Sequence, residues 1–332
     1  MTIGVLDLIN VIPGARLRRA TAVALTSGAL LTTGALATTP AQAAPAQAAP
    51  AQAAPAREAP ARAPLAPAAA TPSIVAKGGF VMNDTSGRAL YTKAADTKRA
   101  TGSTTKIMTA KVVLAQPGLN LDAKVTIQMA YSDYIVSKNA SSARLIVGDK
   151  VTVRQLLYGL MLPSGCDAAY ALADRFGSGK TRGARVKSFI GKMNAEAKKL
   201  GLRNTRFDSF DGIGNGNNYS TPRDLTRLAS SALRNSTFRT IVKTRKYTAR
   251  TVTRKGGTRT MAPWVNTNTL LGSYSGAIGV KTGSGPEAKY CLVFAATRKG
   301  RTVVGTVLTS SSSAQRAKDA TKLMNYGFAR LS

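Results

Sequence analysis

The chain has 332 residues, of which 47 are basic and 15 acidic, and it contains no histidine, so its formal net charge at pH 7 is +32. The absence of histidine excludes every catalytic scheme that needs a histidine base and every metal site with histidine ligands. With only two cysteines and few acidic residues, we also expect no metal site and no cofactor.

The first 72 residues have the composition of an export signal followed by a linker. Within residues 1–43, three arginines precede an apolar stretch at 20–37, and Ala41-Gln42-Ala43 is a cleavage signal. Cleavage or retention as a membrane anchor, and general or twin-arginine export, remain open. Residues 44–72 are rich in alanine and proline, which predicts a semi-extended linker. We expect an exported protein, located in the cell wall, at the outer face of the cytoplasmic membrane or in the medium.

The remaining part, residues 73–332, is long enough for two lobes and carries 42 basic and 13 acidic residues, a net charge of +29. A charge of this size attracts polyanions. An export signal and the absence of a nucleic-acid-binding motif argue against nucleic acid. We expect anionic wall polymers or a membrane surface as partners, although a generally solvated basic surface would have the same composition.

The pattern along this part predicts strands at both ends and helices between them. Strands at both ends imply one antiparallel sheet completed by both termini and flanked by terminal helices, with an all-helical lobe inserted, which is an α+β fold. The sheet lobe would comprise about 73–102 and 248–332, and the helical lobe about 103–247. The predicted strands are 73–82, 88–92, 276–283, 288–297 and 301–308, with strand-like segments in 248–264; the predicted helices are 106–115, 151–162, one from Cys166 or Asp167, 186–200, one from Pro222, and 314–329.

Ser103 and Lys106 form the only S-x-x-K in the chain. Residues three apart are neighbours on a helix, so the lysine can lie beside the serine hydroxyl. Serine is a poor nucleophile at neutral pH and needs an adjacent base, which here must be a lysine or a carboxylate. The pair alone is also typical of an ordinary helix start.

Two further motifs follow in order. Ser164-Gly165-Cys166 begins 61 residues after Ser103, and the only Lys-Thr-Gly, Lys281-Thr282-Gly283, begins 178 residues after it. The order S-x-x-K, second serine motif and K-T-G is the signature of penicillin-binding proteins and serine β-lactamases.

These motifs closely resemble those of the low-molecular-mass penicillin-binding proteins, the serine D-alanyl-D-alanine carboxypeptidases and transpeptidases. The resemblance extends over about 73–329 and includes the segments 201–207, 219–225 and 326–328. Most members have asparagine where this chain has Cys166. A cysteine at this position resembles the second motif of an actinobacterial DD-transpeptidase. The resemblance implies the β-lactamase/DD-peptidase-like fold, peptidoglycan stem peptides as substrates, β-lactams as covalent inhibitors, and a monomer.

The resemblance also implies a role for each motif residue. Ser103 would attack the carbonyl of the penultimate D-alanine while Lys106 takes its proton, and Ser164 would pass a proton to the leaving nitrogen. The remaining residues would bind substrate. They are Cys166, Lys281 and Thr282 (the last two at the terminal carboxylate), Gly283 beside the ligand, Ser284, whose N–H would form the oxyanion hole with that of Ser103, and Arg316, which matches a carboxylate-binding arginine by position.

Two other functions remain open at this point. A β-lactamase is disfavoured because no E-x-x-L-N run lies between Ser164 and Lys281. A non-catalytic penicillin-sensing or wall-binding module is disfavoured by the intact Ser103 and Lys106 pair. The sequence does not decide whether water or an amine accepts the acyl group.

The two cysteines are predicted to be free thiols. Cys166 is expected at a helix start, between two lysines and in an open cleft, which would make it reactive. Cys291 alternates with apolar residues on a predicted strand and is expected to be buried and inert.

Overall fold

A computed structural model describes residues 70–214 and 216–331, all of which belong to one of the two units of the chain, Pro64–Ser332. The predicted export signal and nearly all of the predicted linker lie outside the described residues. No helix of the described part is both long and apolar enough to cross a membrane.

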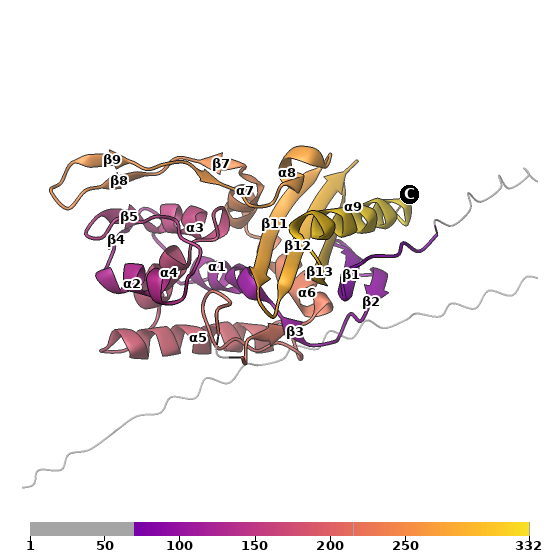
Figure 1. Cartoon of the computed structure of the whole chain (residues 1–332), viewed down its shortest axis with the longest axis horizontal. Helices are drawn as coiled ribbons and strands as arrows, with labels where there is room; N and C mark the ends of the chain where they lie inside the picture. Colours follow the sequence, from indigo (N-terminus) through magenta and orange to yellow (C-terminus); the bar gives the residue numbers. More distant parts are fainter. Residues whose placement is uncertain (1–69, 215, 332) are drawn as a thin grey trace, which may run out of the picture. The chain divides into compact units, whose positions relative to one another are not determined.

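A five-stranded antiparallel sheet joins the two ends of this unit, as predicted (Figure 1). The strand order is β11-β12-β13-β1-β2, so β1, near the N-terminus, pairs with β13 from the C-terminal third of the chain, and β2 adds to the outer side of β1. The strands are β1 (Gly78–Asn83), β2 (Ala89–Lys93), β11 (Ala277–Gly285), β12 (Lys289–Arg298) and β13 (Arg301–Ser310).

Both faces of this sheet are covered, because alternate residues of a strand point to opposite sides. On β12, Leu292 and Phe294 face one core, which the last helix, α9 (Ser313–Ala329), closes with Leu323 and other side chains. The intervening Val293 faces the larger core that continues into the helical lobe. The helix α6 (Pro222–Leu233) packs against β13 and β1.

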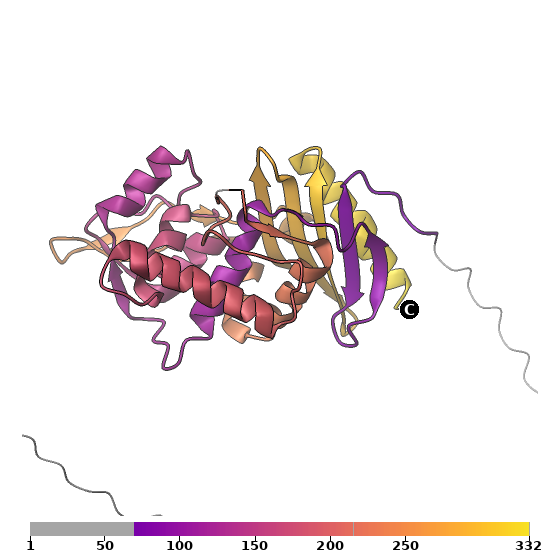
Figure 2. The same cartoon turned by 90° about the horizontal axis from the view of Figure 1, so that it is seen from below.

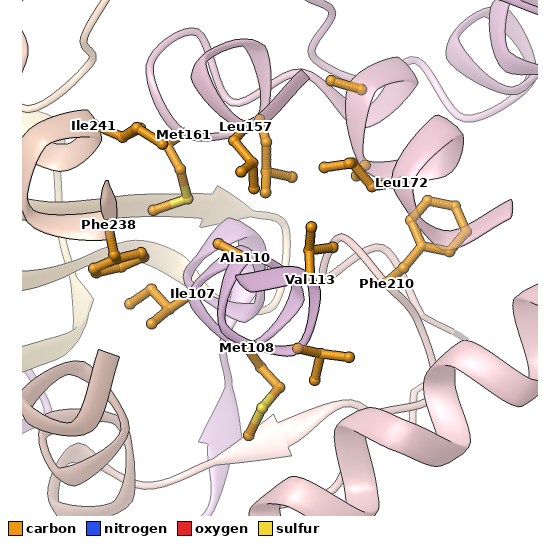
Figure 3. Close-up of a cluster of buried hydrophobic side chains, with 14 of the residues drawn as sticks. Ile107, Met108, Ala110, Val113, Leu157, Met161, Leu172, Phe210, Phe238 and Ile241 are labelled. Atoms are coloured by element: carbon orange, nitrogen blue, oxygen red, sulfur yellow. The ribbon is translucent and has the colours of Figure 1, made fainter. Parts of the chain in front are cut away.

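The centre of the helical lobe is α1 (Lys106–Leu114), seven of whose nine residues are buried (Figure 3). Figure 3 shows side chains from several other helices surrounding Ile107, Ala110 and Val113 of α1. The helices that pack against α1 are α6, α3 (Val153–Met161), α4 (Cys166–Phe176), α5 (Arg182–Lys199) and α7 (Ser236–Lys243), and α2 (Met129–Ser137) packs against α4. Figure 2 shows α5 on the face opposite to the hairpin of β8 (Arg250–Val252) and β9 (Thr258–Thr260) in Figure 1.

Short strands at the outer side of this lobe depart from the predicted pattern. The helix predicted from residue 151 begins at Val153, because Thr152 is its N-cap and forms a capping box with Gln155. Two short strands that precede this helix in the chain join two later strands in a four-stranded sheet, ordered β4-β5-β8-β9. Its members are β4 (Lys124–Thr126), β5 (Lys150–Thr152), β8 (Arg250–Val252) and β9 (Thr258–Thr260).

This pairing bears on the lobe boundary placed at residue 248. The strands β8 and β9 follow that boundary, but β8 pairs with β5 of the helical lobe and β9 pairs with β8, so the chain returns to the five-stranded sheet only later. The remaining elements are β3 (Arg99–Ala100), η1 (Gly102–Thr105), β6 (Tyr219–Ser220), β7 (Lys246–Tyr247), β10 (Trp264–Val265) and α8 (Leu270–Ser273).

Candidate active site

Ser103 lies in the short 3-10 helix η1, and Lys106 is the first residue of α1, which continues it. The Nζ of Lys106 donates a hydrogen bond of 2.9 Å to the Oγ of Ser103. The two residues predicted as a nucleophile and base pair are therefore in direct contact, with Lys106 fully buried.

The position of η1 is fixed by hydroxyl groups on either side of Ser103. Thr101 Oγ1 and Thr105 Oγ1 are 2.8 Å apart, and the side-chain amide of Asn218 donates a 2.8 Å hydrogen bond to each of them. This buried network ties the nucleophile-bearing turn to the chain just before β6.

Lys106 has two further acceptors besides Ser103. Its Nζ lies 3.3 Å from Cys166 Sγ and 3.1 Å from the main-chain carbonyl oxygen of Asp211. The carboxylate of Asp211 accepts from the Tyr134 hydroxyl at 2.9 Å and from the Ile213 N–H at 2.9 Å. Lys106 is thus surrounded by neutral acceptors, and its position is fixed at three points.

Ser164 lies in the turn between α3 and α4 and has a left-handed backbone conformation, with φ at 65°. The hydroxyl of Ser141 donates a 2.6 Å hydrogen bond to the Ser164 carbonyl and so helps to hold this turn. The Oγ of Ser164 is itself buried and has no hydrogen-bond partner among the described residues. A buried hydroxyl without a partner is costly unless a ligand supplies one.

The strand β11 brings the third motif to the same place. Lys281 is buried, and burial, together with the charges of Lys106 and Arg316, lowers its pKa well below 10.5. Its Nζ donates to the Thr282 carbonyl at 3.0 Å. Thr282 Oγ1 lies 2.6 Å from Thr267 Oγ1, so its hydroxyl has a fixed position.

Two glycines allow η1 and β11 to approach closely. A Cβ on Gly283 would lie 2.6 Å from the carbonyl oxygen of Thr101, and a Cβ on Gly102 would lie 2.8 Å from that of Ser284. Real Cβ atoms do not make such contacts with backbone, so only glycine permits this spacing.

Arg316, near the start of α9, reaches the same strand. Its Nη1 donates to the Gly283 carbonyl at 3.0 Å and lies 3.4 Å from that of Cys291. Its guanidinium stands over the Tyr290 ring at 5.8 Å, and burial lowers its pKa below the usual value. The arginine therefore belongs to the site and not to the outer surface.

These elements enclose a cleft of about 410 Å³. Six of the nine predicted site residues line it: Ser103, Ser164, Thr282, Gly283, Ser284 and Arg316. The other three, Lys106, Cys166 and Lys281, are buried behind its wall. In the parts of the chain spanning 70–214 and 216–331, no group of three or more acidic or cysteine side chains is placed to hold a metal ion.

The expectation of an exposed, reactive Cys166 is wrong. Cys166 does begin α4 and does contact a lysine, but it has no exposed surface. Burial raises the pKa of its thiol above 9.0 in spite of the Lys106 charge. Cys291 is also buried, and burial raises its pKa to about 11. Both cysteines are free thiols, as predicted.

Several residues of the site were not found from the sequence. Thr267 and Ser141 line the cleft and position Thr282 and Ser164, but isolated hydroxyl residues carry no motif. Asp167 has a local signal, since an acidic residue in the first turn of α4 is favourable there. Its carboxylate accepts hydrogen bonds from the Ser142 hydroxyl and the N–H groups of Ala143, Leu145 and Ala168.

Comparison with known proteins adds an independent view of this arrangement. The model of the family described as D-alanyl-D-alanine carboxypeptidase matches residues 66–312. The D-alanyl-D-alanine carboxypeptidase of Streptomyces sp. (strain K15) is 67% identical over 314 residues, covering 95% of this chain and 99% of the relative. The D-alanyl-D-alanine carboxypeptidase DacF of Bacillus subtilis is 32% identical, and the match covers 77% of this chain but only 62% of that protein.

Two solved structures are also similar. The crystal structure of the Streptomyces K15 DD-transpeptidase superposes with a TM-score of 0.78 and 76% identity, covering 79% of this chain and all of that chain. The crystal structure of the D-alanyl-D-alanine carboxypeptidase DacD from Francisella tularensis superposes with a TM-score of 0.67 and 27% identity. The match covers 77% of this chain and 71% of that chain. The predicted fold class is confirmed by both matches.

Proposed function

Because this chain belongs to the D-alanyl-D-alanine carboxypeptidase family, we propose that the three motifs around the cleft carry out its reaction with Ser103 as the nucleophile. The chain is a serine-type DD-peptidase that acts on D-alanyl-D-alanine ends of peptidoglycan stem peptides. Neither alternative, a penicillin-sensing module or a β-lactamase, is supported by the relatives.

In the first step, Ser103 Oγ attacks the carbonyl carbon of the penultimate D-alanine and Lys106 Nζ takes the hydroxyl proton. The observation that carries this assignment is their 2.9 Å hydrogen bond in a chain without histidine. The N–H groups of Ser103 and Ser284 stabilise the oxyanion, since both residues line the cleft.

In the second step, the bond between the carbonyl carbon and the leaving nitrogen breaks. Ser164 Oγ donates its proton to that nitrogen and receives in its place the proton that Lys106 took from Ser103, so that both groups return to their starting state. The acyl group remains as an ester on Ser103. Attack by water on this ester gives the carboxypeptidase product, and attack by an amine gives the transpeptidase product.

The substrate is held by β11 and by the basic side chains around it. Since β11 is the edge strand of the sheet, an extended peptide can pair with it as an additional strand. The terminal carboxylate binds at Thr282 with Lys281 and Arg316, two buried basic side chains that make no ion pair within residues 70–214 and 216–331. Cys166 lies behind the cleft and helps to position Lys106, whose Nζ is 3.3 Å from its Sγ.

The test is turnover of a diacyl-Lys-D-Ala-D-Ala peptide with and without a glycine-type amine, together with labelling by a fluorescent penicillin. Ser103→Ala should lose both peptide turnover and labelling, and mass spectrometry of the wild type should locate the penicilloyl adduct on the peptide containing Ser103. Ser137→Ala, at an exposed position of α2, is the matched control and should keep both. An adduct on another residue would overturn the assignment.

We further propose that the protein is exported and acts as a monomer in the wall, with residues 1–43 as its signal and 44–72 as its linker. The substrate class and the net charge of +32 support this location. Sequencing of the mature N-terminus and light scattering of the purified protein test the two parts separately.

A further inference from the structure

A second pocket, of about 590 Å³, lies between β4, α4 and the start of α5 and shares no lining residue with the cleft. In Figure 1, β4 and α4 are at the part of the helical lobe away from the five-stranded sheet. Four basic side chains line this pocket: Lys124, Arg175, Arg182 and Arg185. The only acidic side chain that lines it is Asp174.

Asp174 orients two of these arginines. Its carboxylate is only 6% exposed and accepts from Arg185 Nε at 2.6 Å and from Arg182 Nε at 3.3 Å, while the Tyr131 hydroxyl donates to it at 2.7 Å. Burial alone would raise the pKa of Asp174, but the hydrogen bonds from Arg185 and Tyr131 hold this pKa below its usual value. Each guanidinium is therefore held through its Nε, and the Nη1 of Arg185 also donates to the Lys180 carbonyl at 3.3 Å.

The backbone is also shaped for this approach. Gly177 ends α4, and a Cβ at this position would overlap the carbonyl oxygen of Arg185 in the first turns of α5. A glycine here lets α5 begin directly against the end of α4, which brings Arg182 and Arg185 within reach of Asp174.

The charges around this pocket do not cancel. Four cations face one carboxylate, and neither Lys124 nor Arg175 makes an ion pair in the segments that the structure describes. Those two side chains are exposed and take no part in joining α4 to α5. A purely structural role for the Asp174 network accounts for Arg182 and Arg185 but not for this excess of positive charge.

We propose that this pocket binds a phosphate group of an anionic polymer. Arginine guanidinium groups match the geometry of phosphate oxygens, and lysine adds a compact charge. Exposed Lys180 and Lys187 continue the positive surface beyond the pocket, which favours a chain of phosphates over a single ion. The site would hold the enzyme on a phosphate-bearing polymer while the cleft remains open to peptides.

The experiment measures binding of a fluorescently labelled linear polyphosphate to the full chain at an ionic strength of about 0.15 M, where nonspecific attraction is screened. Lys124→Gln/Arg175→Gln should weaken binding at least about tenfold, since loss of one charge-assisted contact corresponds to about a tenfold change. Arg203→Gln/Arg206→Gln is the matched control, because it removes the same charge from exposed residues of another pocket. It should change the affinity less than about threefold.

Thermal unfolding of both double variants checks that neither has lost its fold. Equal weakening in the two variants would overturn the proposal, because binding would then depend on net charge alone. Competition by inorganic phosphate only at concentrations far above those of polyphosphate phosphate groups supports a polymer, and equal competition contradicts it. Tight binding to vesicles of anionic phospholipid without binding to polyphosphate would also overturn it. None of these outcomes depends on peptidase activity.

Discussion

Replacing Gly102 by alanine tests whether the close approach of η1 to β11 sets the activity. Gly102 has φ at 49°, in the left-handed region, and directly precedes Ser103. An added Cβ would lie 2.8 Å from the carbonyl oxygen and 2.9 Å from the nitrogen of Ser284. The substitution therefore presses on both residues whose N–H groups we propose as oxyanion donors.

Two contributions set the expected loss of acylation rate and of stability in Gly102→Ala. Alanine in the left-handed region costs about 1–2 kcal/mol. In addition, the Ser284 oxygen must move from 2.8 Å to at least 3.4 Å to make an ordinary contact, a shift of about 0.6 Å. A misplacement of about 1 Å in an active site can cost about 100-fold in rate, so we expect acylation to fall by roughly 10- to 100-fold. The melting temperature should fall by roughly 2–8 °C.

The assay is the second-order rate constant for labelling by a fluorescent penicillin, followed by thermal unfolding of the same samples. Gly285→Ala is the matched control, because Gly285 also belongs to β11 and lines the cleft, yet an added Cβ would meet nothing within 4 Å. If Gly102→Ala is labelled at the wild-type rate, or if Gly285→Ala is impaired equally, the proposed steric limit is not real.

Three other variants or treatments probe the buried groups. Both Cys166 and Cys291 should react slowly with a small aromatic disulfide at pH 7 until the protein unfolds, because burial raises the pKa of each thiol; rapid titration of one thiol in the native protein would contradict this. Lys106→Arg should lower the rate of penicillin labelling by at least about 100-fold, since arginine does not give up a proton at neutral pH, and near-normal labelling would exclude the base role. Lys281→Met should weaken peptide binding but stabilise the fold, because burial lowers the pKa of Lys281 well below 10.5 and the unfolded chain therefore binds more protons. Its gain in unfolding free energy over wild type, measured by urea unfolding, should be largest below the folded-state pKa and should shrink as the pH rises to 10.5; a gain that grows with pH would contradict the stated shift.

The parts of the fold that the sequence predicted are those with strong local signals. Thr221 and Pro222 mark the start of α6, where the structure places an N-cap and a proline in the first turn. Continuous, mostly apolar runs marked β12 and β13, which are long and buried on both faces of the sheet. The short strands β4 and β5 have three residues each, which is too few for a period to be visible, and their pairing with β8 depends on contacts distant in sequence.

The site was predictable where chemistry requires a particular side chain and not where it requires a particular position. Ser103 and Lys106 were found because a serine nucleophile needs a base. The carbonyl of Asp211 was not found, because any residue supplies a carbonyl and its place depends on the fold. The burial of Cys166 was missed for the same reason: the start of a helix is exposed unless another segment covers it, and here the 138–142 segment, through Ser141, packs over the thiol.

Two basic side chains at the cleft are buried without a negatively charged partner among the described residues. Lys281 and Arg316 are buried within one site, and neither makes an ion pair in the described portion of the chain. Their hydrogen bonds go to neutral acceptors, which do not offset the cost of removing a cation from water. Such an arrangement destabilises the free protein, so its retention needs a functional cause. We propose that the terminal carboxylate of the D-alanyl-D-alanine substrate supplies the missing negative charge and favours the protonated form of Lys281, so that the instability of the empty cleft becomes selectivity for a peptide with a free carboxyl end.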